Sequence, residues 1–342
     1  LNPTITTNIL SGGEAALGGL TVAEVKTNVA NWYLYSRKRS FVAKAGISAV
    51  VDLKPEFRYG LDTINQSSAF VEAPAALSNN QTHNDALLAS LYDTVWPGSG
   101  TPLRQGLERA GEYYAGNLTG RASPILDSCQ KNYTILMTDG YWNGSDPSVS
   151  DADGDGYDNS VADVAKYYHN TDLNTSLAND VPDDKCDPGN IRCDTEKRQH
   201  MVTYTLAFGV KGNKVDTDGN DWPDPLLAES DDWGDPYNAD SPEKIDDLWH
   251  AAWNSYGKYI NVSTPGEAVD GLTEAIADVS NRQGSASSVA LNAGFISADT
   301  RIYQALFDAF DWSGDLKSFP VLTGGVIGTA VISANDKLPA YG

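Results

Sequence analysis

The order of apolar and polar positions predicts a chain in which helices and strands alternate. Apolar residues recur at intervals of three and four in five segments, which predicts helices at residues 25–52, 84–95, 102–115, 245–258 and 265–283. Shorter apolar or alternating runs predict strands at residues 56–64, 132–140, 199–210 and 258–264. Alternation of this kind favours an α/β fold, with a doubly wound, mostly parallel sheet that carries helices on both faces.

The pattern changes near residues 284–288, where the sequence GSASS reads as a flexible junction. Beyond it the chain is rich in strand-forming residues and shows no helical period. We therefore expect residues 1–284 to form the α/β domain, with long acidic insertions between 139 and 247. Residues 285–342 should form a short β-rich tail that begins a second domain.

Charge narrows the classes of partner. The 342 residues include 24 Lys and Arg against 46 Asp and Glu, a formal net charge of −22. Such a surface repels phosphate backbones and disfavours a nucleic-acid partner. No apolar run approaches 18 residues, so we expect no membrane span in this chain. The four histidines (83, 169, 200 and 250) show no ligand spacing and are expected to be ordinary polar residues.

The stretch DADGDGYDN has the spacing of a calcium loop. Asp151, Asp153 and Asp155 occupy alternate positions, and Gly156 holds the sixth place, as in the first half of an EF-hand. Asp158 or Asn159 could complete the shell. The twelfth place is an alanine, but Asp163 follows it, so the sequence predicts a nonstandard calcium site, against the alternative of a plain Asp-Gly turn.

A second acidic stretch, DTDGNDWPD, repeats part of this spacing. Its candidate ligands are Asp216, Asp218, Asn220 and Asp224, and its sixth place is Asp221 in place of glycine. We treat calcium binding here as an even alternative to an ordinary acidic turn.

Another candidate ligand stands at the end of an apolar run. Asp139 directly follows YTILMT, and ligands of α/β sheets gather at the carboxyl ends of strands. Thr101, at a loop-to-helix start, could add a hydroxyl ligand or could cap the helix. The aromatics Tyr141 and Trp142 could line the rim of such a site, but packing beneath the next loop is favoured.

Cysteine spacing favours an oxidising compartment. Cys186 and Cys193 flank the turn-rich DPGNIR and could close a small disulfide loop, whereas a zinc pair is the weaker alternative. Cys129 could be a free core thiol or could pair outside this chain.

Two of these segments resemble the metal loops of a von Willebrand factor A domain. GTPLRQGL resembles its second loop and LMTDG its third, which implies magnesium at Thr101 and Asp139. The family's first motif, Asp-x-Ser-x-Ser, is missing at its expected place; the match at residues 146–150 lies after the third. We expect the first strand either to lie upstream or to be lost, with residues 4–10 as a degenerate version.

A narrower resemblance covers residues 25 to about 320. In order, the segments NWYLYSRKRSFVAKAGI, ILMTDGYWNG, VADVAKYYHNTDL, QHMVTYTLAFGV and IYQALFDAFDWSGDL resemble the PilY/PilC family of type IV pilus tip adhesins. The family joins an A-like domain to a C-terminal β-propeller, and FDWSGDL resembles the lead into that propeller. The resemblance implies a bacterial surface or pilus-tip location, extracellular or associated with the outer membrane.

We therefore expect a noncatalytic adhesin module that supports pilus assembly, adhesion and surface or force sensing, with minor pilins and a host or surface ligand as partners. One alternative is a metal-dependent extracellular hydrolase, although the sequence holds neither Gly-x-Ser-x-Gly nor His-Glu-x-x-His. The other is a structural cap that adds a strand to minor pilins.

Overall fold

The computed structural model describes residues 20–36, 38–74, 80–95, 100–186, 192–282, 286–291, 301–307, 314–320 and 332–333. The possible first strand at residues 4–10 lies outside these ranges.

A parallel sheet of three strands, in the order β3-β4-β5, forms the centre of the α/β unit. The strands are β3 (Asn132–Thr138), β4 (Met201–Phe208) and β5 (Tyr259–Val262). Every residue of β4 is buried, because neighbours cover both its edges and both its faces. The predicted strands at 132–140, 199–210 and 258–264 are therefore confirmed, and with them a parallel sheet flanked by helices.

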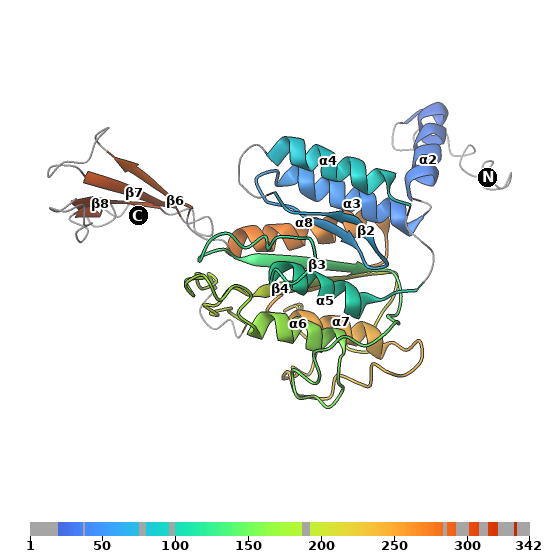
Figure 1. Ribbon diagram of the computed structural model, residues 1–342. Coiled ribbons are helices and arrows are strands. Elements are labelled where there is room, and N and C mark those ends of the chain that lie inside the picture. Colours follow the sequence, from blue (N-terminus) through green and yellow to red (C-terminus); the bar gives the residue numbers. More distant parts are fainter. Residues whose placement is uncertain are drawn as a thin grey trace.

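Helices cover both faces of this sheet (Figure 1). One face carries α3 (Arg39–Leu53) and α8 (Pro265–Arg282), with α4 (Asn80–Asp93) beside α3. The other face carries α5 (Leu103–Tyr114), α6 (Val161–Asn170) and α7 (Glu243–Asn254). A separate apolar core fills each side, around Tyr204 and Leu272 on the first and around Leu107 and Leu248 on the second. The architecture is compatible with a von Willebrand factor A-like fold.

The predicted strand at residues 56–64 is shorter than expected and is not parallel. Strand β1 (Leu61–Thr63) pairs antiparallel with β2 (Gln66–Val71), which the sequence pattern did not predict. Among the described strands this hairpin is a sheet of its own, and β3 is hydrogen-bonded on one edge only.

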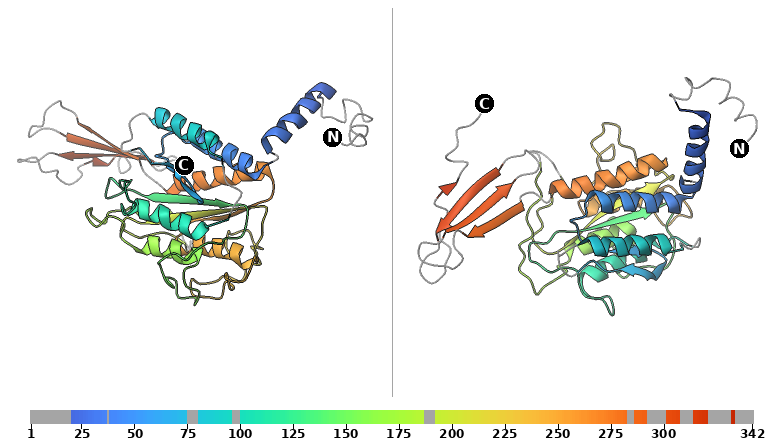
Figure 2. Two further views of the ribbon diagram at one scale, coloured as in Figure 1. Left: turned by 45° about the vertical axis from the view of Figure 1, so that its right-hand side comes forward. Right: turned by 90° about the horizontal axis from the view of Figure 1, so that it is seen from above.

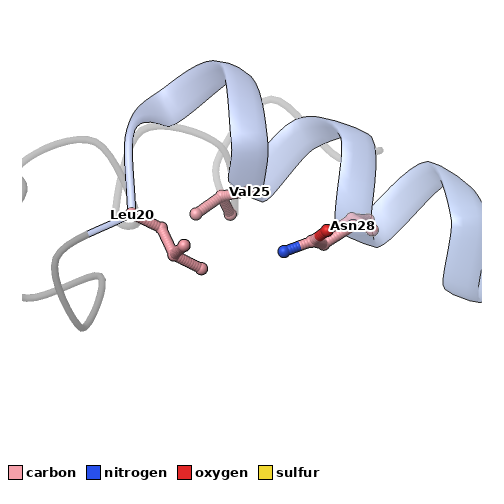
Figure 3. Close-up of a pocket in the computed structure, with 4 residues that line it drawn as sticks. Leu20, Val25 and Asn28 are labelled. Atoms are coloured by element: carbon pink, nitrogen blue, oxygen red, sulfur yellow. The ribbon is translucent and has the colours of Figure 1, made fainter.

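The prediction of one long helix at residues 25–52 is wrong. The chain forms α2 (Val22–Ser36) and α3, separated by an extended residue, Lys38 (φ −119°, ψ 135°). Helix α3 packs against α8, whereas α2 projects from the α/β unit (Figure 2). A hollow of about 300 Å³ lies at the start of α2 and is lined by Leu20, which precedes the helix, and by Val25, Asn28 and Val29 (Figure 3).

The remaining predicted helices are confirmed within a few residues as α4, α5, α7 and α8, and Pro265 opens α8 as expected. Helix α6 was not predicted. None of the helices in the described ranges combines the length and apolar character needed to cross a bilayer.

The described strands of the C-terminal tail form an antiparallel sheet, in the order β6-β7-β8-β9. They are β6 (Ala286–Leu291), β7 (Arg301–Phe307), β8 (Gly314–Pro320) and β9 (Ile332–Ser333). The sheet stands apart from the α/β unit in both views of Figure 2. A β-rich tail is thus confirmed for these strands, while its continuation into a propeller stays a prediction.

Candidate metal centre

The loop between β3 and α6 wraps its backbone around the carboxylate of Asp151. One oxygen of Asp151 accepts from the N–H of Gly154 at 2.7 Å, and the other accepts from the N–H of Gly156 at 3.2 Å. Both glycines have positive φ (82° and 93°), which side-chain-bearing residues rarely adopt. The glycines of DADGDG are therefore what allows the tight turn that brings alternate aspartates together.

Asp163 closes this loop from the first turn of α6. It forms a capping box with Ser160: each side chain accepts a hydrogen bond from the other residue's backbone N–H. Its other oxygen, Oδ1, accepts from the N–H of Ala152 at 2.6 Å. As a result Asp151, Asp153 and Asp163 each place a carboxylate oxygen within 4.8 Å of the others.

Helix α7 covers the loop from the opposite side. Asn254 Nδ2 donates to Asp153 Oδ2 at 2.6 Å. The ring nitrogens of His250 lie 3.4 Å from Asp153 Oδ2 and 3.7 Å from Asp155 Oδ2. The side chains of Asp153 and Asp155 are only 0% and 4% exposed, so water cannot screen them. Burial lowers the pKa of His250 to about 3, so this ring carries no charge at neutral pH that could offset them.

The electrostatics of this loop favour a bound cation. Burial, and then the charges of Asp163 and Asp155, raise the pKa of Asp153 to about 8. Burial is also the main cause that raises the pKa of Asp155, to about 6, and that raises the pKa of Asp163. Carboxylates held out of water close to one another disfavour their own ionised forms, and a divalent ion would reverse that preference.

The two residues proposed to complete the shell lie elsewhere. Asn159 Oδ1 accepts from the backbone N–H groups of Val149 and Ser150, at 3.1 and 2.9 Å. Asp158 is exposed, and its backbone oxygen accepts from the hydroxyl of Tyr237. The described structure therefore groups Asp163, not Asp158 or Asn159, with the alternate aspartates. The sequence pattern missed His250 and Asn254, because their distance along the chain gives no spacing signal.

The second acidic loop adopts the same turn as the first. Asp216 accepts from the N–H of Gly219 at 2.8 Å and from the N–H of Asp221 at 2.9 Å. Asp218 accepts from the N–H of Asn220 at 3.2 Å, as Asp153 does from Asp155. Gly219 and Asp221 have positive φ (77° and 70°). Asp221, the sixth residue of this loop, therefore adopts the left-handed conformation that Gly156 adopts in the first loop.

Three carboxylates of this second loop also converge. Asp216, Asp218 and Asp224 each have an oxygen within 4.8 Å of the others. The Oδ1 of Asn220 accepts from the N–H of Trp222 at 2.8 Å. Hydrogen bonds from the side chain and backbone of Thr217 lower the pKa of Asp224. The group is more exposed than the first, so water competes more strongly with any ion there.

Thr101 and Asp139 lie on adjacent loops, as the resemblance to an adhesion-type site implies. A Cβ placed on Gly140 would be 3.9 Å from Thr101 Oγ1. The cation beside Asp139 is Arg39, whose Nη1 lies 3.5 Å from the carboxylate and donates to the Asp139 backbone oxygen at 2.7 Å. Pro102 occupies the N-cap of α5, so the alternative of Thr101 as a side-chain cap is wrong.

The aromatics after Asp139 pack inward, as favoured. Trp142 is 3% exposed, and its indole N–H donates to Asp247 Oδ2 at 2.7 Å. Tyr141 is partly buried against the same core. Asp247 also accepts from the N–H groups of Val161 and Ala162, at 3.1 and 3.0 Å, and so fixes the start of α6.

The cysteine prediction is confirmed: Cys186 and Cys193 form a disulfide. Cys129 is a free thiol, but it is exposed and does not lie in the core.

The fold and the loops together define the class: an α/β domain with a parallel sheet and two loops in which aspartate carboxylates converge. Three curated proteins resemble this chain, all named type IV pilus biogenesis factor PilY1, from Pseudomonas aeruginosa. The protein of strain PAK is 28% identical over 88% of this chain, that of strain UCBPP-PA14 is 29% identical over 86%, and that of strain PAO1 is 27% identical over 88%.

These relatives confirm the resemblance to the PilY/PilC family. The chain spans about 30% of their length. No protein-family model matches the chain, and no solved structure matches it.

Proposed function

We propose that this chain is a noncatalytic, calcium-stabilised module of a type IV pilus protein at the bacterial surface. The convergence of Asp151, Asp153 and Asp163 in one loop is the single observation that carries the calcium part. The pilus part rests on the PilY1 relatives, whose name states a role in pilus biogenesis.

Calcium fits the first loop better than magnesium does. Calcium accepts six to eight oxygen ligands in flexible geometry, whereas magnesium requires a near-ideal octahedron and keeps several waters. The loop offers crowded carboxylates whose positions are set by backbone hydrogen bonds. Asp151, Asp153, Asp155 and Asp163 are the ligands that we propose for it, and Asp216, Asp218, Asn220 and Asp224 for the more exposed second loop.

The ion would act by neutralising charge at a packing interface. Asp153 lies against His250 and Asn254 of α7, and the capping box of Asp163 starts α6. Occupied loops would therefore stabilise both helices on one face of the sheet. A domain stiffened in this way suits a pilus-tip adhesin that carries load while it contacts minor pilins and a host or surface ligand.

Calorimetry with calcium and with magnesium tests the metal sites, with Asp153→Ala and Asp139→Ala as separate variants. We expect calcium heat that Asp153→Ala removes and Asp139→Ala leaves unchanged. Absence of calcium binding to the folded wild-type chain would contradict the proposal. Magnesium at Thr101 and Asp139 is a weaker proposal, because Arg39 would first have to leave Asp139.

The pilus role is tested in the bacterium that encodes the chain, by placing Asp153→Ala in the full-length protein. We expect fewer surface pili at equal protein level, since the module would be less stable outside the cell. Unchanged pilus number, with calcium binding shown to be lost, would separate the metal site from pilus assembly.

One observation favours the second candidate, a structural cap that adds a strand to minor pilins. Among the described strands, β3 pairs with β4 only, so its other edge is a place where a strand could add. Disulfide trapping between a cysteine at Thr134 on β3 and cysteines in a minor pilin would test this, and trapping equal to that of an exposed control position such as Asp270 would contradict it.

A further inference from the structure

A second group of metal-binding side chains lies away from the acidic loops. His169 is in the last turn of α6, His200 directly precedes β4, and Asp194 follows Cys193 of the disulfide. Their side chains are 4%, 4% and 6% exposed. Neither histidine has ligand spacing in the sequence, which predicts ordinary polar residues, but the fold brings both to the carboxylate of Asp194.

The ligand atoms are spaced as they would be around one small ion. The Nε2 atoms of His169 and His200 lie 3.3 and 2.9 Å from the same oxygen, Asp194 Oδ2. Zinc binds histidine and carboxylate at about 2.0–2.1 Å in a tetrahedron, which puts neighbouring ligand atoms roughly 3.3 Å apart. Only a small shift of these side chains would therefore seat a zinc ion.

The tautomer of His200 supplies an independent argument. Its Nδ1 lies 2.7 Å from the backbone oxygen of Arg198, which can only accept, so Nδ1 carries a hydrogen. In the neutral ring Nε2 then carries a lone pair and accepts hydrogen bonds only. This atom lies 2.9 Å from the carboxylate oxygen Oδ2 of Asp194. Two acceptors at this distance need a positive charge between them, which is a proton on Nε2 or a metal ion.

The surroundings hold all three groups in place. Asp194 Oδ1 accepts from the N–H of Glu196 at 3.0 Å, and the Asp194 backbone oxygen accepts from the N–H of Asp184 at 2.8 Å. The ring of His169 stacks on Tyr256, with centroids 4.9 Å apart. A metal-bound histidine characteristically donates its other N–H to a carbonyl or carboxylate, as His200 does to Arg198.

We propose that His169, Asp194 and His200 form a buried zinc site that fastens the segment following Cys193 to α6 and to the start of β4. Two imidazoles and one carboxylate are a zinc set, whereas calcium prefers oxygen ligands alone. Three ligands from the described residues leave one tetrahedral position for a water molecule. The proton alternative would give a metal-free ion pair between Asp194 and His200.

Cobalt titration distinguishes the two alternatives, because tetrahedral cobalt absorbs strongly in the visible range. The protein is stripped of metal and kept free of reductant, so that the disulfide stays closed. It carries Cys129→Ser, since an exposed thiol also binds these metals. We expect one equivalent of cobalt to bind, with tetrahedral absorption that one equivalent of zinc abolishes.

His169→Ala and His200→Ala should each weaken binding by at least about 100-fold, since loss of even an outer-shell partner costs about 10- to 100-fold. His83→Ala is the matched control, because its imidazole bonds the backbone oxygen of Tyr59 far from the cluster. This control should bind cobalt as the parent does.

Absence of the tetrahedral signal in the folded parent overturns the site, and so does binding that survives both histidine substitutions. If those variants fail to fold, X-ray absorption of the zinc-loaded parent decides. A shell with two imidazoles supports the site, and a shell of oxygen or sulfur alone overturns it.

Discussion

At the scale of single residues, the loop of residues 151–163 combines two opposed demands. Asp153 must be buried against Asn254 to hold α7, yet it must also carry charge to bind a cation. Without an ion, burial and the neighbouring acids raise the pKa of Asp153 to about 8, so holding this carboxyl lowers the stability of the fold at neutral pH. Asp153 would thus be the most important calcium ligand and, without calcium, the one that most lowers the free energy of unfolding.

The effect of Asp153→Asn on stability should therefore differ in sign between calcium-free and calcium-containing buffer. In excess EDTA we expect the variant to be as stable as the parent or more so, because asparagine avoids the cost of burying a carboxyl whose pKa is raised to about 8. With calcium at 100 times its Kd, the parent should gain about 2.7 kcal/mol by linkage and the variant should gain little. Urea denaturation with and without calcium measures both.

Asp158→Asn is the matched control, since it removes the same charge from an exposed side chain of the same loop. If Asp158→Asn lost the stabilisation by calcium and Asp153→Asn kept it, the result would contradict a site that includes Asp153.

A glycine in the core gives a test of packing that is independent of metal. A Cβ on Gly111 of α5 would lie 2.3 Å from the ring of Tyr168 on α6. Gly111→Ala should lower the free energy of unfolding by about 1–3 kcal/mol through overpacking. Gly266→Ala, in α8, meets nothing within 4 Å and should raise it by about 0.4–1 kcal/mol. Urea melts that show equal stability for the two variants would contradict this packing.

At the scale of elements, the sequence predicted the helices and strands that follow from a local hydrophobic period. It missed those whose position is set by residues distant along the chain. Strand β4 is buried throughout because both its faces lie under helices, and β3 contributes side chains to both apolar cores. Helix α6 has only 10 residues and begins inside the acidic segment, and its start is fixed by Asp247 from far along the chain. Similarly, the apolar residues on either side of Lys38 keep a helical spacing, so the sequence pattern does not reveal that α2 ends and α3 begins there.

The candidate site shows the same division. Alternate aspartates with glycines predicted the turns of both acidic loops, because those turns are made by hydrogen bonds within nine residues. His250 and Asn254 come from α7, and only the folded chain brings them to Asp153.

Asp247 should be the residue through which α7 holds α6. Asp247→Asn would put an NH2 group in place of one carboxylate oxygen, and so would lose either the bond from Ala162 or the bonds from Trp142 and Val161. We expect a loss of about 1–3 kcal/mol in the free energy of unfolding and weaker calcium binding, because Asp163 sits in the turn that Asp247 fixes. Calorimetry and urea melts measure the two effects. Asp270→Asn, exposed on α8, should change neither.

At the scale of the whole molecule, the described C-terminal strands pair only with one another. A chain that ends at Gly284 should therefore keep the melting temperature and calcium response of the α/β unit. It retains Arg282, which pairs with Asp184 and Asp278. Thermal melts followed by circular dichroism measure this, and a truncated chain that no longer melts cooperatively would show that the tail is part of the same folding unit.

Helix α7 touches both acidic loops. His250 lies against Asp153 of the first, and the indole N–H of Trp249 donates to the backbone oxygen of Asp221 in the second, at 3.3 Å. Calcium binding that orders either loop should therefore also order α7, which contacts the other loop. We therefore expect the two sites to bind calcium cooperatively. Because linkage is reciprocal, each occupied loop should tighten the other by the same factor, typically about 5- to 150-fold. The domain would then respond to calcium over a narrow range of concentration, as a threshold and not as a graded scale.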